Sequence, residues 1–220
     1  MGSLESGFAM KSHLLYGTVL AAVVVSLSIA APRPAIVQRP GQWTLEVRYE
    51  HPQQIVLPGG PNGESRFWYM ILTVTNRTGQ DVEFYPKCDL MTDTFQIVPA
   101  GRGVPPVVFE QIRQRHRSVY PFLESLQKVG NRILEGEDNA RDIVVIWQDF
   151  DPQATGFKVF IGGLSNETAV VNHPVAVDET GRPVPVYLRK TLELAYGFRG
   201  DPTLRPSVEV VYKDHEWVMR

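Results

Sequence analysis

The strongest strand signal in the chain is the stretch Arg66-Phe67-Trp68-Tyr69-Met70-Ile71-Leu72-Thr73-Val74-Thr75-Asn76. It consists largely of aromatic and β-branched residues, which favour strands. In its first half the apolar residues follow one another without alternation, as they do in a strand that is covered on both faces. The stretch therefore predicts a central strand with protein on either side of it.

Further strand patterns lie before and after this stretch. Residues 44–50 alternate strictly between apolar and polar side chains, and a turn rich in Pro and Gly follows at residues 58–63. Later strands are expected at residues 81–85, 91–98, 141–147, 156–161, 186–196, 208–212 and 216–218. Because these short strands do not alternate regularly with helices, the sequence predicts a mainly β fold built as an antiparallel β-sandwich.

Residues 107–134 show helical rather than strand spacing. Residues 107–115 follow Pro105-Pro106, which is a favourable helix start. After Pro121, apolar side chains recur at helical intervals as far as Leu134. We expect two short helices here, inserted between the strands at about residues 107–134.

An uncharged apolar stretch of 18 residues lies at positions 14–31, after Lys11. It fits a signal peptide that is cleaved before Ala31, because Ser28 and Ala30 place small residues at the cleavage site. It also fits an uncleaved transmembrane helix, because a helix of this length spans about 27 Å. The apolar side chains of such an anchor include Leu14, Leu20, Val24 and Leu27.

The chain is thus expected to have three parts. Residues 1–31 are a signal or anchor segment, residues 32–42 are a Pro-rich linker, and residues 43–220 are the β-sandwich domain. The positive charge before the apolar stretch stays in the cytoplasm, so the domain is exported. We expect it in the periplasm or on the outer face of the cytoplasmic membrane, with a single-pass anchor favoured over a cleaved signal peptide.

The composition narrows the classes of function. Hydrophobic residues make up 43% and charged residues 21% of the 220 residues, which are values of a globular protein. The formal net charge of −2 shows no excess of basic residues, which a nucleic-acid-binding protein would need. The chain has one cysteine, Cys88, so an internal disulfide and a multi-thiolate metal site are excluded.

Two sets of residues carry a resemblance to known proteins. Trp43, the run Phe67-Trp68-Tyr69-Met70 and the strand end Val74-Thr75-Asn76-Arg77-Thr78-Gly79 resemble immunoglobulin-like domains of exported bacterial proteins. Residues 135–142 and Gly162-Gly163-Leu164-Ser165 are similar to a family of exported proteins with no assigned activity. The resemblance spans residues 43–220. It implies an immunoglobulin-like sandwich but indicates no catalytic or binding activity.

No pattern in the chain indicates catalysis. The histidines are all more than 30 residues apart, so no short metal-binding pair occurs. No Gly-x-Ser-x-Gly elbow is present. Lys87 can lower the pKa of the neighbouring Cys88 thiol, although a lone cysteine is more often buried and inert. We predict no catalytic residue, no metal or cofactor, and no enzyme activity.

Two charged segments are candidate partner-binding surfaces. The basic one consists of Arg113, Arg115, His116 and Arg117, which fall on little more than one helical turn. It suits an acidic protein surface or anionic headgroups. The acidic one consists of Glu135, Glu137 and Asp138 in an expected loop at residues 135–142, whose spacing does not fit an EF-hand.

These observations favour a non-catalytic, exported and membrane-anchored subunit that makes interaction or structural contacts in an envelope or membrane protein complex. A short anchor and a proline spacer hold such a domain close to partners in the bilayer. The alternative is a secreted module that binds a ligand such as a polysaccharide. Its stacking platform would be Trp43, Trp68, Trp147 and Trp217, although their strand positions favour core packing.

Overall fold

The computed structural model describes residues 41–59, 63–201 and 204–220. In chain order its elements are β1 (Glu46–Tyr49), β2 (Gln53–Pro58), β3 (Glu64–Asn76), β4 (Val82–Glu83), β5 (Lys87–Thr92), β6 (Ile97–Pro99), α1 (Pro106–His116), β7 (Glu124–Ser125), β8 (Arg132–Ile133), β9 (Gly136–Gln148), β10 (Gly156–Gly162), β11 (Thr168–Val177), β12 (Pro183–Arg199), the short 3₁₀ helix η1 (Arg205–Ser207) and β13 (Glu209–Met219). The prediction of a mainly β fold is confirmed.

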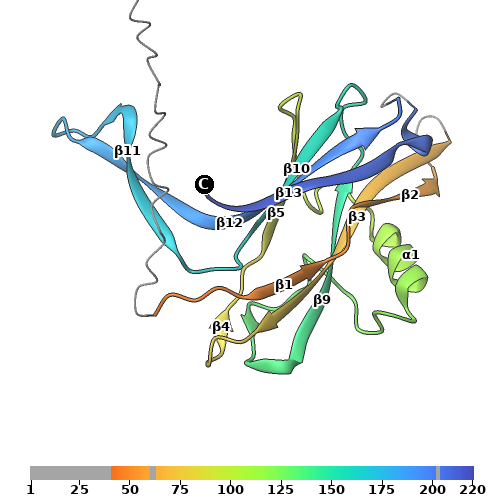
Figure 1. Cartoon of the computed structure of the whole chain (residues 1–220), viewed down its shortest axis with the longest axis horizontal. Helices are drawn as coiled ribbons and strands as arrows, with labels where there is room; N and C mark the ends of the chain where they lie inside the picture. Colours follow the sequence, from red (N-terminus) through yellow and green to blue (C-terminus); the bar gives the residue numbers. More distant parts are fainter. Residues whose placement is uncertain (1–40, 60–62, 202–203) are drawn as a thin grey trace, which may run out of the picture. The chain divides into compact units, whose positions relative to one another are not determined.

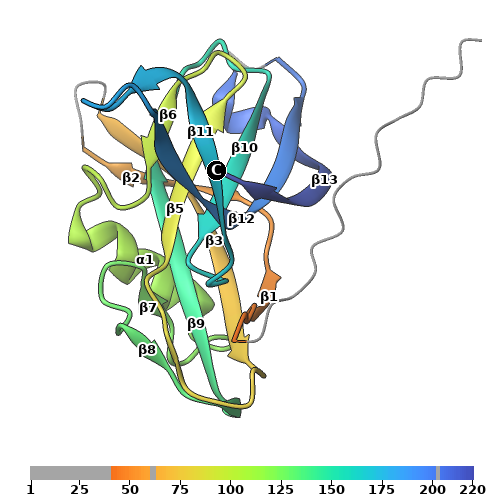
Figure 2. The same cartoon turned by 90° about the vertical axis from the view of Figure 1, so that its left-hand side faces the viewer.

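The strands form two larger sheets and a two-stranded ribbon of β4 and β8 (Figures 1 and 2). In the first sheet, β3 has β9 on one side and β1 and β2, one after the other, on its other side. Strand β7 pairs with β9 in parallel, while the other described pairs are antiparallel. The second sheet has the order β11–β12–β10–β5–β6, and β13 also pairs with β12.

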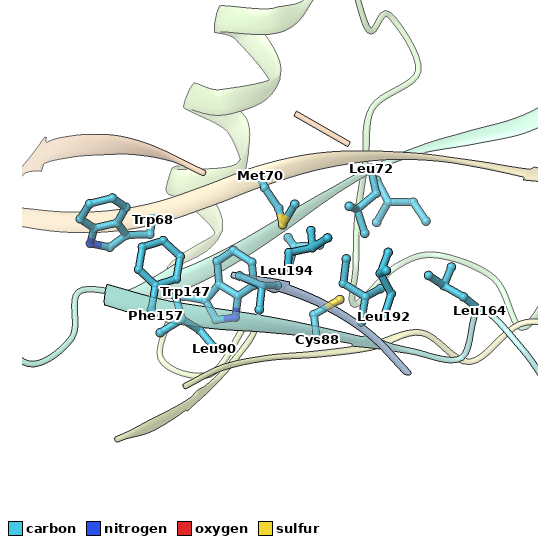
Figure 3. Close-up of a cluster of buried hydrophobic side chains, with 14 of the residues drawn as sticks. Trp68, Met70, Leu72, Cys88, Leu90, Trp147, Phe157, Leu164, Leu192 and Leu194 are labelled. Carbon is cyan, nitrogen blue, oxygen red and sulfur yellow. The ribbon is translucent and has the colours of Figure 1, made fainter. Parts of the chain in front are cut away.

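The two sheets share one hydrophobic core (Figure 3). Trp68 and Met70 of the first sheet lie in the same buried cluster as Leu90, Leu192 and Leu194 of the second. Removal of this apolar surface from water is the main favourable term in folding. The two sheets are therefore held together by the side chains that β3 and β9 direct toward β5, β10 and β12.

The opposite face of β3 is covered by helix α1. Tyr69 and Ile71 of β3 form a second buried cluster with Val108 and Ile112 of the helix. Pro106 begins the helix, in agreement with the predicted start. Successive residues of β3 thus point into two different clusters, and the prediction of a central strand covered on both faces is confirmed.

The second predicted helix, after Pro121, is wrong. The chain there forms the two short strands β7 and β8, joined by a turn, instead of a helix. Leu123 and Ile133 are buried, as the spacing predicted, but Phe122 and Leu134 are 84% and 44% exposed. The apolar side chains therefore do not share one helix face. Ser125 pairs with β9, so this segment continues the first sheet.

The prediction of a loop at residues 135–142 is also wrong, because residues 136–142 belong to a strand. Strand β9 begins at Gly136, which pairs with Asn76 at the end of β3, and the regular register with β3 starts at Arg141 after an irregularity. The pairing of Thr73 with Asp142 and of Val74 with Arg141 explains the extended backbone. The acidic side chains lie on an exposed strand end and not on a free loop.

One hairpin extends beyond the shared core. Residues 190–199 of β12 pair with β13, and most of them also pair with β10, whereas residues 183–189 of β12 pair with β11. We call residues 168–189 the arm. Figure 1 shows β11 and the first part of β12 leading away from the strands that enclose the core.

Candidate functional site

The arm carries five of the 14 large apolar side chains that are exposed in the described part of the chain. No residue in it is buried. Val175 and Tyr187 are 83% and 69% exposed, and Val170, Val171 and Val177 are also exposed. A two-stranded hairpin is marginally stable alone in water, and a contiguous exposed apolar surface marks a contact site.

Both faces of the arm are apolar. The pairs Val171–Val186 and Ala169–Leu188 lie on one face. Because side chains alternate along a strand, this face of β12 is the same one that carries Leu192 into the core. The core-facing stripe therefore continues along the arm, past the residues that the first sheet covers. Val170 and Tyr187 form a pair on the opposite face.

The tip of the arm is a well-ordered polar turn. Asp178 accepts hydrogen bonds from the Thr180 hydroxyl at 2.7 Å and from the backbone N–H groups of Thr180 and Arg182 at 2.8 and 2.9 Å. The bond from the Thr180 side chain is the main reason that the pKa of Asp178 is lowered. Gly181 has φ of 77°, a backbone region that glycine enters readily.

One edge of the arm is closed to strand addition. The N–H of Arg189 points to Arg220, on the β13 side of β12, while the N–H of Lys190 points to Glu167 on the other side. Backbone N–H groups point to opposite edges of a strand in successive residues, so every second residue before Arg189 directs its N–H to the β13 side. Pro183 and Pro185 occupy two of these positions. Proline has no N–H to donate, so this edge resists pairing with a further strand.

The root of the arm holds a buried ion pair. Lys190 Nζ lies 2.5 Å from Glu167 Oε1, and the two side chains are 11% and 4% exposed. Thr44 donates to the same Glu167 oxygen at 3.2 Å and accepts from Lys190 at 3.2 Å. Lys190 also lies 5.1 Å from the centroid of the Trp217 ring. The network joins Thr44, the residue directly before β11, strand β12 just after the arm, and β13, and it fixes where the arm leaves the core.

The basic segment of α1 divides into two groups. Arg115 donates to the Tyr69 hydroxyl at 3.3 Å, and His116 Nε2 lies 3.0 Å from the same oxygen. Tyr69 is buried, so these two side chains attach the helix to the sheet. Arg113 and Arg117 instead line a surface hollow of about 500 Å³ beside Pro121.

Arg113 is already engaged within its own helix. It pairs with Glu110 at 2.5 Å, and its guanidinium carbon lies 5.7 Å from the centre of the Phe109 ring. Arg117 is exposed and has no ion pair within the described residues. A partner that binds this hollow would therefore meet one free guanidinium and not four cationic groups.

The acidic segment is used largely for local structure. Glu137 forms an ion pair with Arg77, which also contacts Glu46 at 3.3 Å. Glu135 accepts a hydrogen bond from the Gly79 N–H at 3.0 Å. Asp138 is exposed. No hydrogen bond or ion pair connects this segment with the basic residues of α1 in the described part of the chain.

A polar groove of about 450 Å³ lies on the α1 side of the first sheet. Two of its carboxylates are engaged: Tyr120 donates to Glu50 at 2.6 Å and Thr73 donates to Asp142 at 2.7 Å. Burial, and next the Glu50 carboxylate, raise the pKa of Tyr120 to about 12. The raised pKa keeps the Tyr120 hydroxyl in its neutral form, which is a poor nucleophile.

The remaining sequence candidates fall in the core or outside the described residues. Cys88 is buried, and burial raises the pKa of its thiol. Trp68 and Trp147 are completely buried, as their strand positions favoured, and Trp43 and Trp217 are partly buried. Within residues 41–59, 63–201 and 204–220, no group of His, Cys, Asp or Glu is placed to hold a metal ion.

The four anchor residues Leu14, Leu20, Val24 and Leu27 lie outside the described residues. Among the residues that are described, no helix is long and apolar enough to cross a membrane.

Comparisons with protein-family models, with curated proteins and with solved structures find no match for this chain. The resemblance to immunoglobulin-like exported proteins therefore stays a prediction.

Proposed function

We propose that this protein is a non-catalytic interaction subunit whose arm inserts into a protein partner. The observation that carries the proposal is an apolar hairpin, exposed on both faces, that leaves the core at a fixed point. A surface that lay flat on a partner would cover one face only. Because Val171 and Val186 are on one face and Val170 and Tyr187 on the other, we infer that the partner supplies a cleft that encloses the arm.

We further propose that the domain is an immunoglobulin-like sandwich. In chain order, β1, β3, β5, β7, β9, β10 and β12 take the places of strands A to G, with A–B–E–D in one sheet and C–F–G in the other. The parallel pairing of β7 with β9 departs from this fold. The arm then corresponds to the F–G connection, a position that variable domains use to bind partners.

The apolar segment at residues 14–31 supports a location outside the cytoplasm and attachment to the membrane. We propose that the partner belongs to an envelope or membrane complex, since an anchored domain meets such proteins at high local concentration. The alternative of a polysaccharide-binding module has no exposed tryptophan pair to support it among the described residues.

The arm proposal is tested by replacing its exposed apolar side chains in the full chain. The variant carries Val170→Ser, Val175→Ser and Tyr187→Ser. A matched control carries Phe95→Ser, Val119→Ser and Phe122→Ser, which change exposed apolar side chains away from the arm. Each protein is expressed in its native host, extracted in mild detergent and separated by size.

We expect the native chain and the control to migrate in one complex of fixed composition, and the arm variant to migrate alone with an unchanged melting temperature. The proposal fails if the arm variant stays in the complex, or if the native chain is found without a partner. An intact mass near 24.8 kDa supports the anchor, whereas a chain about 30 residues shorter shows a cleaved signal peptide.

A further inference from the structure

A second surface feature lies at the root of the arm, on the outer face of the second sheet. It is a hollow of about 340 Å³ whose lining includes Tyr85, Phe160, Gly162, Arg189 and Arg220. The residues come from the segment before β5, from β10 and β12, and from the chain after β13. Of these residues Arg189 alone belongs to the arm, at its base, and none belongs to the two charged segments that the sequence predicts as partner surfaces.

The hollow exists because a glycine stands in the middle of a row of side chains. Gly162 pairs with Lys87 on β5 and lies beside Thr191 on β12. A Cβ placed on Gly162 would lie 3.7 Å from the Lys87 carbonyl oxygen and 3.8 Å from Thr191 Oγ1. These are ordinary contact distances, so the backbone has room for a side chain here, and its absence leaves the floor of the hollow open.

Two arginines face each other across this hollow. Arg189 and Arg220 exchange both backbone hydrogen bonds, at 2.8 and 3.2 Å, so their Cα atoms lie about 5.5 Å apart and their side chains share a face. Like charges directly opposite on neighbouring strands are destabilising. The pair therefore has an electrostatic cost that an anion between the guanidinium groups would remove.

The two arginines have no ion-pair partner in the hollow. Lys87 and Asp89 both line the hollow and pair with each other at 3.2 Å, so their charges offset one another. Neither Arg189 nor Arg220 forms an ion pair with any described residue. The guanidinium carbon of Arg220 lies 3.9 Å from the centre of the Phe160 ring, which holds its planar group in place.

We propose that this hollow binds a phosphate group. Two unpaired guanidinium groups match the charge of a phosphate dianion, and their forked donors fit its oxygens. The Tyr85 ring is 60% exposed at the rim and offers a flat apolar surface to whatever carries the phosphate. The phosphate can belong to a small soluble molecule or to a lipid headgroup.

The test uses the full chain in a nonionic detergent at low ionic strength, where charge interactions are least screened. Inorganic phosphate is titrated into the native chain, Arg189→Gln, Arg220→Gln and the control Arg199→Gln. Arg199 lies on the same strand and its replacement changes the charge equally, but it pairs with Glu209 away from the hollow. Calorimetry gives the affinity, and thermal unfolding shows that each variant is folded.

We expect saturable binding of one phosphate to the native chain and to Arg199→Gln. Loss of one charge-assisted contact should weaken binding roughly tenfold in Arg189→Gln and in Arg220→Gln. A further variant, Gly162→Leu, fills the hollow without a change of charge and should abolish binding. The proposal is overturned if the native chain shows no saturable binding, or if all variants bind equally.

A second titration separates the two sources of the phosphate. Phosphatidylcholine vesicles with and without phosphatidylglycerol are added to the native chain and to Arg189→Gln. A difference between the two proteins only on phosphatidylglycerol vesicles assigns the site to a lipid headgroup. Equal binding of both proteins to these vesicles, with phosphate binding still dependent on Arg189, assigns it to a soluble phosphate compound.

Discussion

Lys190 and Glu167 form an ion pair at the root of the arm that is almost completely removed from water, with Nζ 2.5 Å from Oε1. Removing one partner of such a pair leaves the other charge buried and uncompensated. We expect Lys190→Ala to lower the free energy of unfolding by about 3–5 kcal/mol. Urea denaturation of the full chain in detergent measures this loss.

The double variant Lys190→Met with Glu167→Leu leaves no unpaired charge behind and should recover most of that stability. Arg199→Ala provides the control at an exposed ion pair, where we expect a loss within about 1 kcal/mol. Equal losses for Lys190→Ala and Arg199→Ala would show that the pair at the root is not buried in solution.

Gly163 and Gly79 have nearly the same backbone conformation, with φ of 86° and 83°, but different surroundings. A Cβ on Gly163 would lie 2.4 Å from the Tyr85 carbonyl oxygen, whereas none of the described atoms lies within 4 Å of one on Gly79. Gly79→Ala should cost about 1–2 kcal/mol, the price of the left-handed conformation. Gly163→Ala should cost more, because the backbone of two segments must also move apart.

Both variants carry the cost of placing alanine in the left-handed backbone conformation. The difference between their losses of stability therefore measures the clash of the Gly163→Ala side chain with the Tyr85 carbonyl. Thermal unfolding of the two proteins under the same conditions measures it. Equal melting temperatures would mean that the turn after β10 shifts away from Tyr85 without cost.

Sequence alone predicts the central strand because both of its faces carry apolar residues. Within residues 66–76, apolar side chains project from both faces of the strand. The structure accordingly places Trp68 and Tyr69 in separate buried clusters. The same reasoning fails after Pro121, because Leu123 and Ile133 are buried there without a helix. A helix would have placed Phe122 and Leu134 on the buried face as well, but short strands and turns beside β9 bury Leu123 and Ile133 and leave Phe122 and Leu134 exposed.

The arm was not predicted, although valines on both sides of the turn at residues 178–182 are a hairpin signal. Its apolar residues look like those of any covered strand. Whether a second layer covers them depends on where the facing sheet ends, and no local pattern contains that information. Likewise, the proximity of Arg115 and His116 to Tyr69 depends on the docking of α1 on β3.

High pH should destabilise the domain through partly buried tyrosines whose pKa is raised in the folded state. Burial, and next a hydrogen bond with Tyr212, raise the pKa of Tyr49 to about 12. Tyr120 has a pKa raised to about 12, from an ordinary value of 10.0. Between pH 10 and 12 the folded protein thus holds protons that the unfolded chain releases, so stability falls as the pH rises.

Urea midpoints across this range measure the effect. We expect a plateau below pH 10 and a decline above it, where the unfolded tyrosines ionise. Tyr120→Phe removes one of the tyrosines with a raised pKa and should make the decline shallower. A decline of unchanged steepness in that variant would show that Tyr120 ionises normally in the folded state.

Cys88 should be unreactive in the folded protein. Its side chain lies in the core between the sheets, and burial, and next the Asp89 carboxylate, raise the pKa of the thiol. Because the thiolate is the reactive species, a thiol–disulfide exchange reagent at neutral pH should modify the native chain only as fast as the domain opens. Reaction in concentrated guanidinium should be immediate and complete.

The rates of thiol modification with and without denaturant distinguish a cysteine in the core from one that is exposed and can pair between chains. If opening limits the reaction, sub-denaturing urea should accelerate it in proportion to the unfolded population. The destabilised variant Lys190→Ala should then react faster than the native chain at the same reagent concentration. Rapid reaction of the native chain, or equal rates in both proteins, would place the thiol at the surface and make an intermolecular disulfide feasible.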